Sequence, residues 1–237
     1  MKEIKILHLF PRLLSLYGEY GNVVMVKATL ESKGCAVTVT ECEDGSADFA
    51  AYDFIYVGSG TEDNLMVALQ RLLPHAESVK ESVAKGKVWL ATGNAMALFG
   101  KSLTRKESQP AIGAFDYATV IDDSKRFLGD VLTCGAPATL GFINTSCVYT
   151  GIENSMLELQ LNKNLGNDKK SAAEGIREKN FFGTQLIGPF LVKNPHYMEA
   201  VCSLLTGEEV TVDKDSNMAK AYAVARKELR TRAGFAE

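Results

Sequence analysis

The chain has 237 residues, of which 46% are hydrophobic and 23% are charged, an ordinary composition for a globular protein. Its net charge is −3 and it has no run of five like charges, so composition gives no support to binding of nucleic acid or of an anionic membrane. The longest apolar runs are strand-length, too short to span a bilayer. The first residues also lack the long apolar segment of a signal peptide. We therefore expect a cytoplasmic protein without nucleic-acid or membrane partners.

Cysteine and histidine are few and scattered. The chain has five cysteines, never in a CxxC pair, and three histidines, and their spacing fits no metal-ligand pattern. Without a secretion signal, reduced thiols are expected. The sequence has no GxxxxGK[ST] motif, and its one Gly-x-Gly turn lacks the third glycine of a dinucleotide fingerprint. We expect neither a metal nor a cofactor.

The first hundred residues alternate between predicted strands and predicted helices. The strands are expected at 5–10, 36–40, 54–57 and 87–91. The helices are expected at 19–33 and 62–84, and Pro74 should break or kink the second of them. This alternation predicts an α/β fold with a mostly parallel central sheet and helices on both faces.

The second half of the chain has a different pattern. Shorter strands are expected at 114–121, 130–134, 140–144 and 156–161, followed by a polar loop at 162–180, a strand at 182–186 and helices at 196–205 and 217–232. This half is therefore predicted to be β-rich. No linker rich in Pro, Gly or Ser divides the chain, which predicts a single domain over 1–237.

Three stretches follow predicted strands at the carboxyl edge of the sheet, where open α/β proteins bind ligands. They are the Gly58-Ser59-Gly60 turn, Thr92-Gly93-Asn94 within "KVWLATGNAMALFG" (87–100), and the segment 186–189. The second has the strand–turn–helix outline on which many α/β enzymes present a nucleophile. Its turn holds no cysteine, however. The first could aim backbone N–H groups at an anion, or could need glycine only for its backbone conformation.

Four stretches carry a resemblance to a known family. They are "HLFPRLLSLYGEYGN" (8–22), "YVGSGTEDN" (56–64), "LATGNAMALFG" (90–100) and "FFGTQLIGPFLVKNP" (181–195). Together they resemble the amidotransferase subunits of lipid II isoglutaminyl synthases, which belong to the cobyric-acid-synthase-like class I glutamine amidotransferases. The resemblance covers about 4–205, so 206–237 would be a C-terminal helical extension. It implies the flavodoxin-like class I glutamine amidotransferase fold.

The resemblance also implies an activity and the residues that perform it. Family members hydrolyse glutamine with a cysteine on the elbow and a histidine at a later strand end, and pass the ammonia to a Mur-ligase-like partner that amidates the peptidoglycan precursor. Position by position, the cysteine falls on Gly93 and the histidine on Ile187. Glycine has no side chain to attack with and isoleucine cannot accept a proton. The usual Cys–His route is therefore closed at both steps.

Other parts of the family pattern are present. Gly58, Ser59 and Gly60 match the glycine-rich oxyanion loop, with serine in place of its middle glycine, and Arg126 matches an arginine that helps to hold glutamine. These residues and Asn94 are the candidates for a substrate pocket. Arg126 could equally be a solvated charge beside neighbouring aspartates.

The sequence therefore predicts a catalytically degenerate amidotransferase-like protein with a binding or regulatory role. Its candidate partners are a Mur-ligase-like protein and glutamine or a similar small molecule. The alternative is an active glutamine amidotransferase whose site is rearranged or completed by a partner. The scattered thiols give that alternative little support, because Cys134 and Cys147 lie on or near predicted strands, where a free cysteine usually packs as a small hydrophobe.

Overall fold

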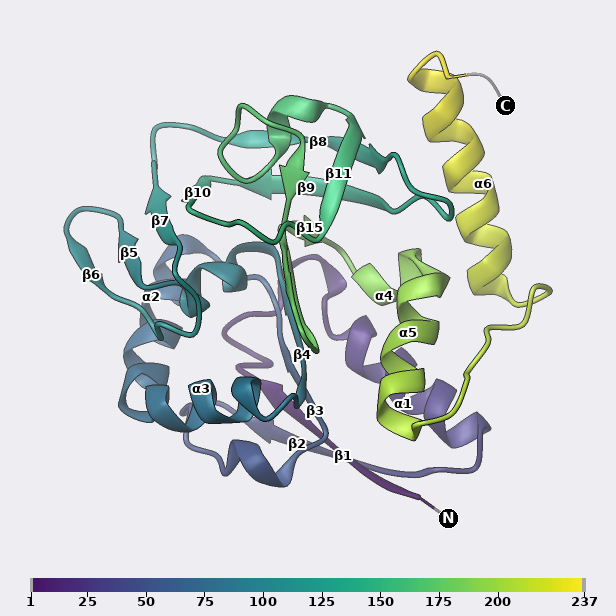
Figure 1. The fold of residues 1–237 in the computed structure, drawn as a ribbon, viewed down its shortest axis with the longest axis horizontal. Helices are drawn as coiled ribbons and strands as arrows, with labels where there is room; N and C mark the ends of the chain where they lie inside the picture. Colours follow the sequence, from purple (N-terminus) through teal and green to yellow (C-terminus); the bar gives the residue numbers. More distant parts are fainter. Residues whose placement is uncertain (1, 236–237) are drawn as a thin grey trace.

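The computed structural model describes residues 2–235, and its centre is a six-stranded sheet in the order β13–β14–β4–β3–β1–β2 (Figure 1). The strands are β1 (Glu3–Leu9), β2 (Ala36–Cys42), β3 (Phe54–Val57), β4 (Val88–Thr92), β13 (Ile176–Glu178) and β14 (Phe181–Thr184). Five of them are parallel, and only β13 runs antiparallel to its neighbour. The parallel strands have the order 2-1-3-4-5 along the chain, which is the order of flavodoxin-like folds.

Helices cover both faces of this sheet. One face packs against α1 (Gly21–Ser32), α4 (Phe190–Lys193) and α5 (Pro195–Thr206). The other packs against α2 (Glu62–Leu72), α3 (Ala76–Ala84) and the 3₁₀ helix η4 (Gly93–Phe99). All four residues of β3 are buried because both of their faces are covered. The predicted parallel sheet with helices on both faces is confirmed.

The second predicted helix is interrupted where Pro74 was expected to interrupt it. A 3₁₀ turn at Leu73–His75 separates α2 from α3, since proline cannot supply the N–H that a continuous helix would need. The start of α2 is fixed by Thr61, whose side chain accepts a hydrogen bond of 3.1 Å from the Asn64 amide. The helix therefore begins directly after the glycine turn at 58–60.

The second half forms two smaller sheets, which lie to the left of and above the central sheet in Figure 1. One has the order β10–β7–β5–β6 and the other β12–β11–β8–β9–β15. Their strands are β5 (Ser102–Thr104), β6 (Ser108–Pro110), β7 (Ala118–Ile121), β8 (Phe127–Thr133), β9 (Leu140–Thr145), β10 (Cys147–Thr150), β11 (Leu157–Leu161), β12 (Ala173–Glu174) and β15 (Leu186–Ile187). The β-rich half is confirmed, but the sequence analysis missed β5, β6 and β10. It also read the segment that carries β12 and β13 as loop.

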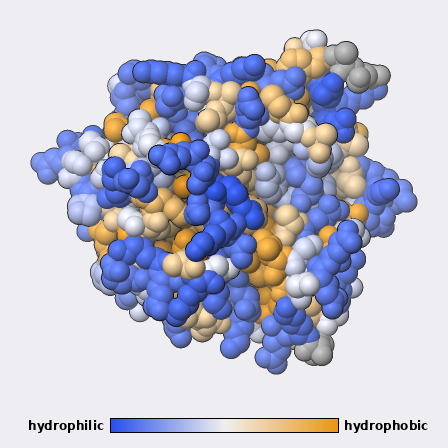
Figure 2. All heavy atoms as spheres, in the orientation of Figure 1, coloured by the Kyte–Doolittle hydropathy of each residue, from blue (hydrophilic) through white to orange (hydrophobic). Residues whose placement is uncertain are grey.

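The last helix, α6 (Asn217–Arg232), lies beside the five-stranded sheet (Figure 1). Leu229 and Tyr222 on this helix pack against Leu132 and Leu140 of the sheet. The remaining short elements are the 3₁₀ helices η1 (Leu16–Gly18), η2 (Phe49–Ala51) and η5 (Lys163–Leu165). In the described part of the chain, none of the helices has the length and apolar character needed to cross a bilayer. The face in Figure 2 is largely hydrophilic, with a band of hydrophobic atoms over the region of β4 and α5.

Candidate functional site

The three stretches predicted at the carboxyl edge of the sheet do meet in the structure. The turn at 58–60 follows β3, Gly93 follows β4, and Ile187 ends β15. The Gly93 backbone lies against the side chains of both Ser59 and Ile187. Ser59 and Ile187 are each only 3% exposed. The site at this edge is therefore packed with protein atoms around the elbow.

Gly93 has the backbone conformation of an elbow but no room for a side chain. Its φ is +62°, in the left-handed region that favours glycine. An ideal Cβ placed on Gly93 would lie 2.4 Å from Ser59 Oγ, 2.5 Å from Ser59 Cβ and 3.0 Å from Ile187 Cγ2. Contacts below 3.0 Å force a neighbour to move. Ser59 thus fills the space into which a side chain at residue 93 would point.

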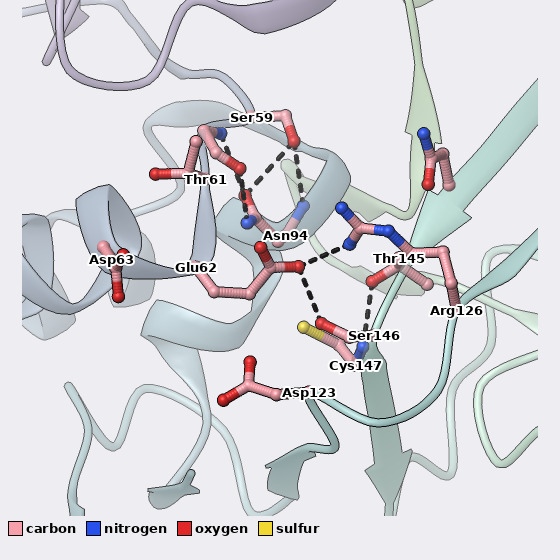
Figure 3. Close-up of polar contacts among 12 residues, drawn as sticks. Ser59, Thr61, Glu62, Asp63, Asn94, Asp123, Arg126, Thr145, Ser146 and Cys147 are labelled. Atoms are coloured by element: carbon pink, nitrogen blue, oxygen red, sulfur yellow. Dashed lines mark hydrogen bonds and ion pairs between the residues drawn. The ribbon is translucent and has the colours of Figure 1, made fainter.

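The backbone amides beside the elbow are hydrogen-bonded within the chain (Figure 3). The Gly60 N–H donates to Asn94 Oδ1 over 3.1 Å, and Asn94 Nδ2 donates to the Gly60 carbonyl over 2.7 Å. The Ser59 hydroxyl donates to Asn94 Oδ1 over 3.2 Å and accepts a longer contact of 3.4 Å from the Asn94 amide. An oxyanion hole needs N–H groups that are free to point at the developing charge. Here both amides already have acceptors.

The sequence analysis did not single out Glu19, a buried carboxyl group that contacts Thr92, the residue before the elbow glycine. Glu19 is fully buried and accepts hydrogen bonds from the Tyr56 hydroxyl, over 2.8 Å, and from the Thr92 hydroxyl. Burial raises the pKa of Glu19 to about 7, although these hydrogen bonds, the Gly188 amide and the positive charge of Lys193 favour the carboxylate. The one sequence feature that could have pointed to Glu19 is its place between Gly18 and Gly21, inside the stretch 8–22 that carries the family resemblance. Its burial depends on contacts with strands far along the chain.

Arg126 lies at the outer side of the same region, where Glu62 holds it. Arg126 Nη1 is 2.5 Å from Glu62 Oε1, and the Ser146 hydroxyl donates to the same oxygen over 2.7 Å (Figure 3). Burial opposes ionisation of Glu62, but the hydrogen bonds from Ser146 and Arg126 outweigh it and lower the pKa of Glu62. The Arg126 side chain is 46% exposed. Arg126 is therefore paired with Glu62, the first residue of α2, which follows the glycine turn at 58–60 and the helix-capping Thr61.

Within the described residues, no hydrogen bond or ring contact joins His8, His196 or Cys147 to Gly93, Ser59 or Asn94. Burial lowers the pKa of both His8 and His196 to about 4, which makes each a weak base near pH 7. Burial also raises the pKa of Cys147, the cysteine next to Ser146. Cys134 is exposed but follows the far end of β8, about 25 Å of extended strand from Arg126. No group of three or more His, Cys, Asp and Glu side chains in residues 2–235 could hold a metal ion.

Comparison with known proteins agrees with this architecture. No protein-family model matches the chain. It is 26% identical over 205 residues to the lipid II isoglutaminyl synthase (glutamine-hydrolyzing) subunit GatD of Streptococcus pneumoniae, covering 81% of this chain and 76% of the relative. It is 25% identical over 205 residues to the same subunit of Staphylococcus aureus, covering 82% and 81%. A crystal structure of a glutamine amidotransferase superimposes with a TM-score of 0.53 at 15% identity, covering 83% of this chain and 98% of that one.

The fold is that of a class I glutamine amidotransferase. The chain is a homologue of the GatD subunits and resembles them over about four fifths of its length. The predicted fold class is confirmed. The candidate residues Ser59, Gly60 and Asn94 lie in hydrogen-bonded contact, and Gly58 precedes them in the same buried turn. Arg126 forms its ion pair with Glu62, which lies two residues after Gly60.

Proposed function

We propose that this chain is a catalytically degenerate GatD-like subunit that binds or regulates a partner instead of hydrolysing glutamine. The observation that carries the proposal is the filled elbow: Gly93 offers no nucleophile, and Ser59 and Ile187 occupy the place of its missing side chain. The relatives are named as glutamine-hydrolyzing, and their family uses a cysteine and a histidine at the two positions that hold Gly93 and Ile187 here.

The hydrogen bonds of Asn94 support the same proposal. A pocket kept for acyl transfer would leave the amides of the turn and elbow free for the oxyanion of the tetrahedral intermediate. In this chain Asn94 and Ser59 are acceptors for those amides. A change of the nucleophile alone would leave such a hole open. Here the nucleophile, the base and the oxyanion donors are all altered, which fits relaxed selection on the chemistry.

The proposed partner is a Mur-ligase-like protein, because the relatives are subunits of lipid II isoglutaminyl synthase. On this proposal the chain acts in the cytoplasm as one domain over 1–237, within the cobyric-acid-synthase-like amidotransferases, on the amidation of a peptidoglycan precursor. Arg126 and the turn at 58–60 would contact whatever small molecule enters from the outer side. Glu62 already neutralises Arg126, so a bound carboxylate would have to displace it.

The test is a glutaminase assay on the full chain, alone and co-expressed with a Mur-ligase-like protein. We expect no ammonia release from the wild type in either case. The informative variant carries Ser59→Gly, Gly93→Cys, Asn94→Gly and Ile187→His together, which restores both reactive groups, clears the space beside residue 93 and frees the Gly60 amide. Measurable hydrolysis by this variant would locate the defect in these residues.

The matched control carries only Gly93→Cys and Ile187→His. It should stay inactive, because Ser59 still blocks the Cys side chain and Asn94 still occupies the Gly60 amide. Hydrolysis by the wild type with its partner present would overturn the proposal. It would favour the alternative of a rearranged site, above all if alkylation of the thiols abolished that activity.

A further inference from the structure

The strand β2 forms an open edge of the central sheet. Within residues 2–235 it pairs only with β1. The Ala36 amide donates to the Lys2 carbonyl, and the Cys42 carbonyl accepts from the Phe10 amide. Since alternate residues of a parallel strand direct both backbone groups to the same side, the even-numbered residues of β2 face β1. The backbone groups of the odd-numbered residues Val37, Val39 and Glu41 therefore face outward.

No hydrogen bond in the described part of the chain ties these outward groups to another element. Apart from the exposed Glu41 near its end, the edge lacks the features that usually protect one. β2 contains no lysine or proline, and its seven-residue pairing with β1 has no register shift. Val37 and Val39 pack against the core on the face that α1 covers, whereas the side chains of Thr38 and Thr40, on the other face, are exposed. The strand is thus long, regular and accessible along its free side.

The opposite edge of the same sheet, formed by β13, is covered by another segment of the chain. β13 has only three residues, runs antiparallel to β14, and is bordered by the segment before β11. The Arg177 amide donates to the Asn154 carbonyl over 3.0 Å, and the Met156 amide donates to the Glu174 carbonyl over 3.0 Å. The fold therefore covers the β13 edge and leaves the β2 edge open.

We propose that β2 pairs with β2 of a second copy of this chain, antiparallel and around a two-fold axis at Val39. In this register Val39 faces its own counterpart, and Val37 faces Glu41 of the second copy. All three outward-facing residues then form hydrogen-bonded pairs. A register shifted by two residues in either direction would leave one of them unpaired. The two central sheets would join into one continuous sheet.

The side chains of β2 are self-complementary in this register. Thr38 lies opposite Thr40 of the second copy on both sides of the axis, and threonine pairs stabilise antiparallel strands. The chain enters β2 near the exposed Lys33 and leaves it through Glu41 and Glu43. Antiparallel pairing brings the basic start of one strand beside the acidic end of the other, and no like charges lie directly opposite. A second copy is therefore a better match than an unrelated strand.

The experiment measures the mass of the full-length chain in solution, by light scattering and native mass spectrometry, at concentrations up to about 100 µM. We expect a dimer for the wild type. In Thr38→Lys/Thr40→Lys, each lysine would lie opposite a lysine of the second copy, and the dissociation constant should rise at least about tenfold. These side chains are exposed, so the variant should fold, which its thermal unfolding checks.

The matched control is Thr38→Glu/Thr40→Lys, in which each glutamate faces a lysine of the second copy. It adds charges at the same two positions but should dimerise at least as well as the wild type. Thr38→Cys/Thr40→Cys should also form disulfides between chains on mild oxidation, because residues opposite at non-hydrogen-bonded positions lie about 4.5 Å apart between Cα atoms. A wild type that is monomeric throughout, or two charged variants that dimerise equally, would overturn the proposal.

Discussion

Ser59 occupies the space that a side chain on Gly93 would need, with its Oγ 2.4 Å from the position of an ideal Cβ. The two residues lie on consecutive strand ends of the sheet, in the turn after β3 and at the end of β4. An elbow that carries a nucleophile must leave this space open, since the reactive atom projects into it. The Ser59 side chain therefore packs closely against Gly93, and it leaves no room for a nucleophilic side chain at residue 93.

This complementarity predicts a stability coupling between the two positions. Gly93→Ala should lower the free energy of unfolding by about 2 to 4 kcal/mol, because it adds strain at a positive φ and a clash with Ser59. In a Ser59→Gly background the clash with the Ser59 side chain disappears, while the contact with Ile187 remains, and the loss should fall by about 1 to 2 kcal/mol. A double-mutant cycle in urea measures the difference.

Gly34 supplies the control for this cycle. Its φ is +81°, and nothing lies within 4 Å of an added Cβ, so Gly34→Ala reports the backbone strain without a clash. We expect its cost to be no larger than that of Gly93→Ala in the Ser59→Gly background, where Ile187 Cγ2 still lies 3.0 Å from the added Cβ. Equal costs for Gly93→Ala with and without Ser59 would show that the serine does not fill the elbow.

The hydrogen bonds of Asn94 lead to a second prediction. Asn94→Ala leaves the Gly60 N–H and carbonyl and the Ser59 hydroxyl without the partner they have now. Buried groups that lose their partners cost about 1 to 3 kcal/mol each when no water replaces the bond, so the three groups together should cost the variant at least about 3 kcal/mol in chemical denaturation.

Asn64→Ala is the comparison for this variant. The Asn64 side chain makes one hydrogen bond, to the Leu13 carbonyl over 2.9 Å, at a partly buried position, so its removal should cost about 1 kcal/mol. A loss for Asn94→Ala no larger than that of Asn64→Ala would mean that water takes over the amides of the turn. The oxyanion position would then be accessible to a ligand.

The sheet could be predicted from the sequence because its signals are local. The strands at 36–40 and 54–57 and the interruption at Pro74 follow from β-branched runs, glycine boundaries and the missing proline N–H. The elbow at Gly93 was predicted for the same reason, since an apolar strand ends there in a glycine turn. Each of these features is decided within a few residues.

The hydrogen bonds and the burial of the site residues could not be predicted from local sequence patterns. Nothing in the sequence around Asn94 shows that its side chain binds Gly60, which lies 34 residues earlier. The burial of Glu19 depends in the same way on Tyr56 and Thr92. Short strands such as β12, with two residues, exist only because neighbouring strands pair with them. These features arise from contacts between residues far apart in the sequence, and the spacing of apolar residues does not predict such contacts.

The buried Glu19 predicts a pH dependence of stability. In the folded chain its pKa is raised to about 7, whereas its ordinary value is 4.5. Between these values the native state holds a proton that the unfolded chain releases, so the contribution of Glu19 becomes less favourable as pH rises through this window. At about 1.4 kcal/mol per pKa unit, the loss is about 3 kcal/mol. Glu19→Gln should remove this loss.

Chemical denaturation at pH 5 and pH 8 measures the effect. The wild type should lose more stability than Glu19→Gln between these two values. Glu81→Gln is the control, because an exposed hydrogen bond to Lys85 lowers the pKa of Glu81, and its removal should not flatten the profile in this window. A Glu19→Gln variant with the same pH profile as the wild type would place the Glu19 pKa near its ordinary value.

Thiol reactivity supplies the last prediction, because it tests whether any cysteine could replace the missing nucleophile. Burial raises the pKa of Cys42, of Cys147 and, to about 12, of Cys202, and thiols protected in this way react slowly. Cys134 is exposed and Cys35 is partly buried. Brief iodoacetamide treatment of the native chain should therefore add at most two adducts by mass spectrometry, with Cys134 labelled first, while the chain unfolded in guanidinium should add five. Rapid labelling of Cys147 in the native chain would contradict this order, and would place a reactive thiol next to Ser146 at the outer side of the site.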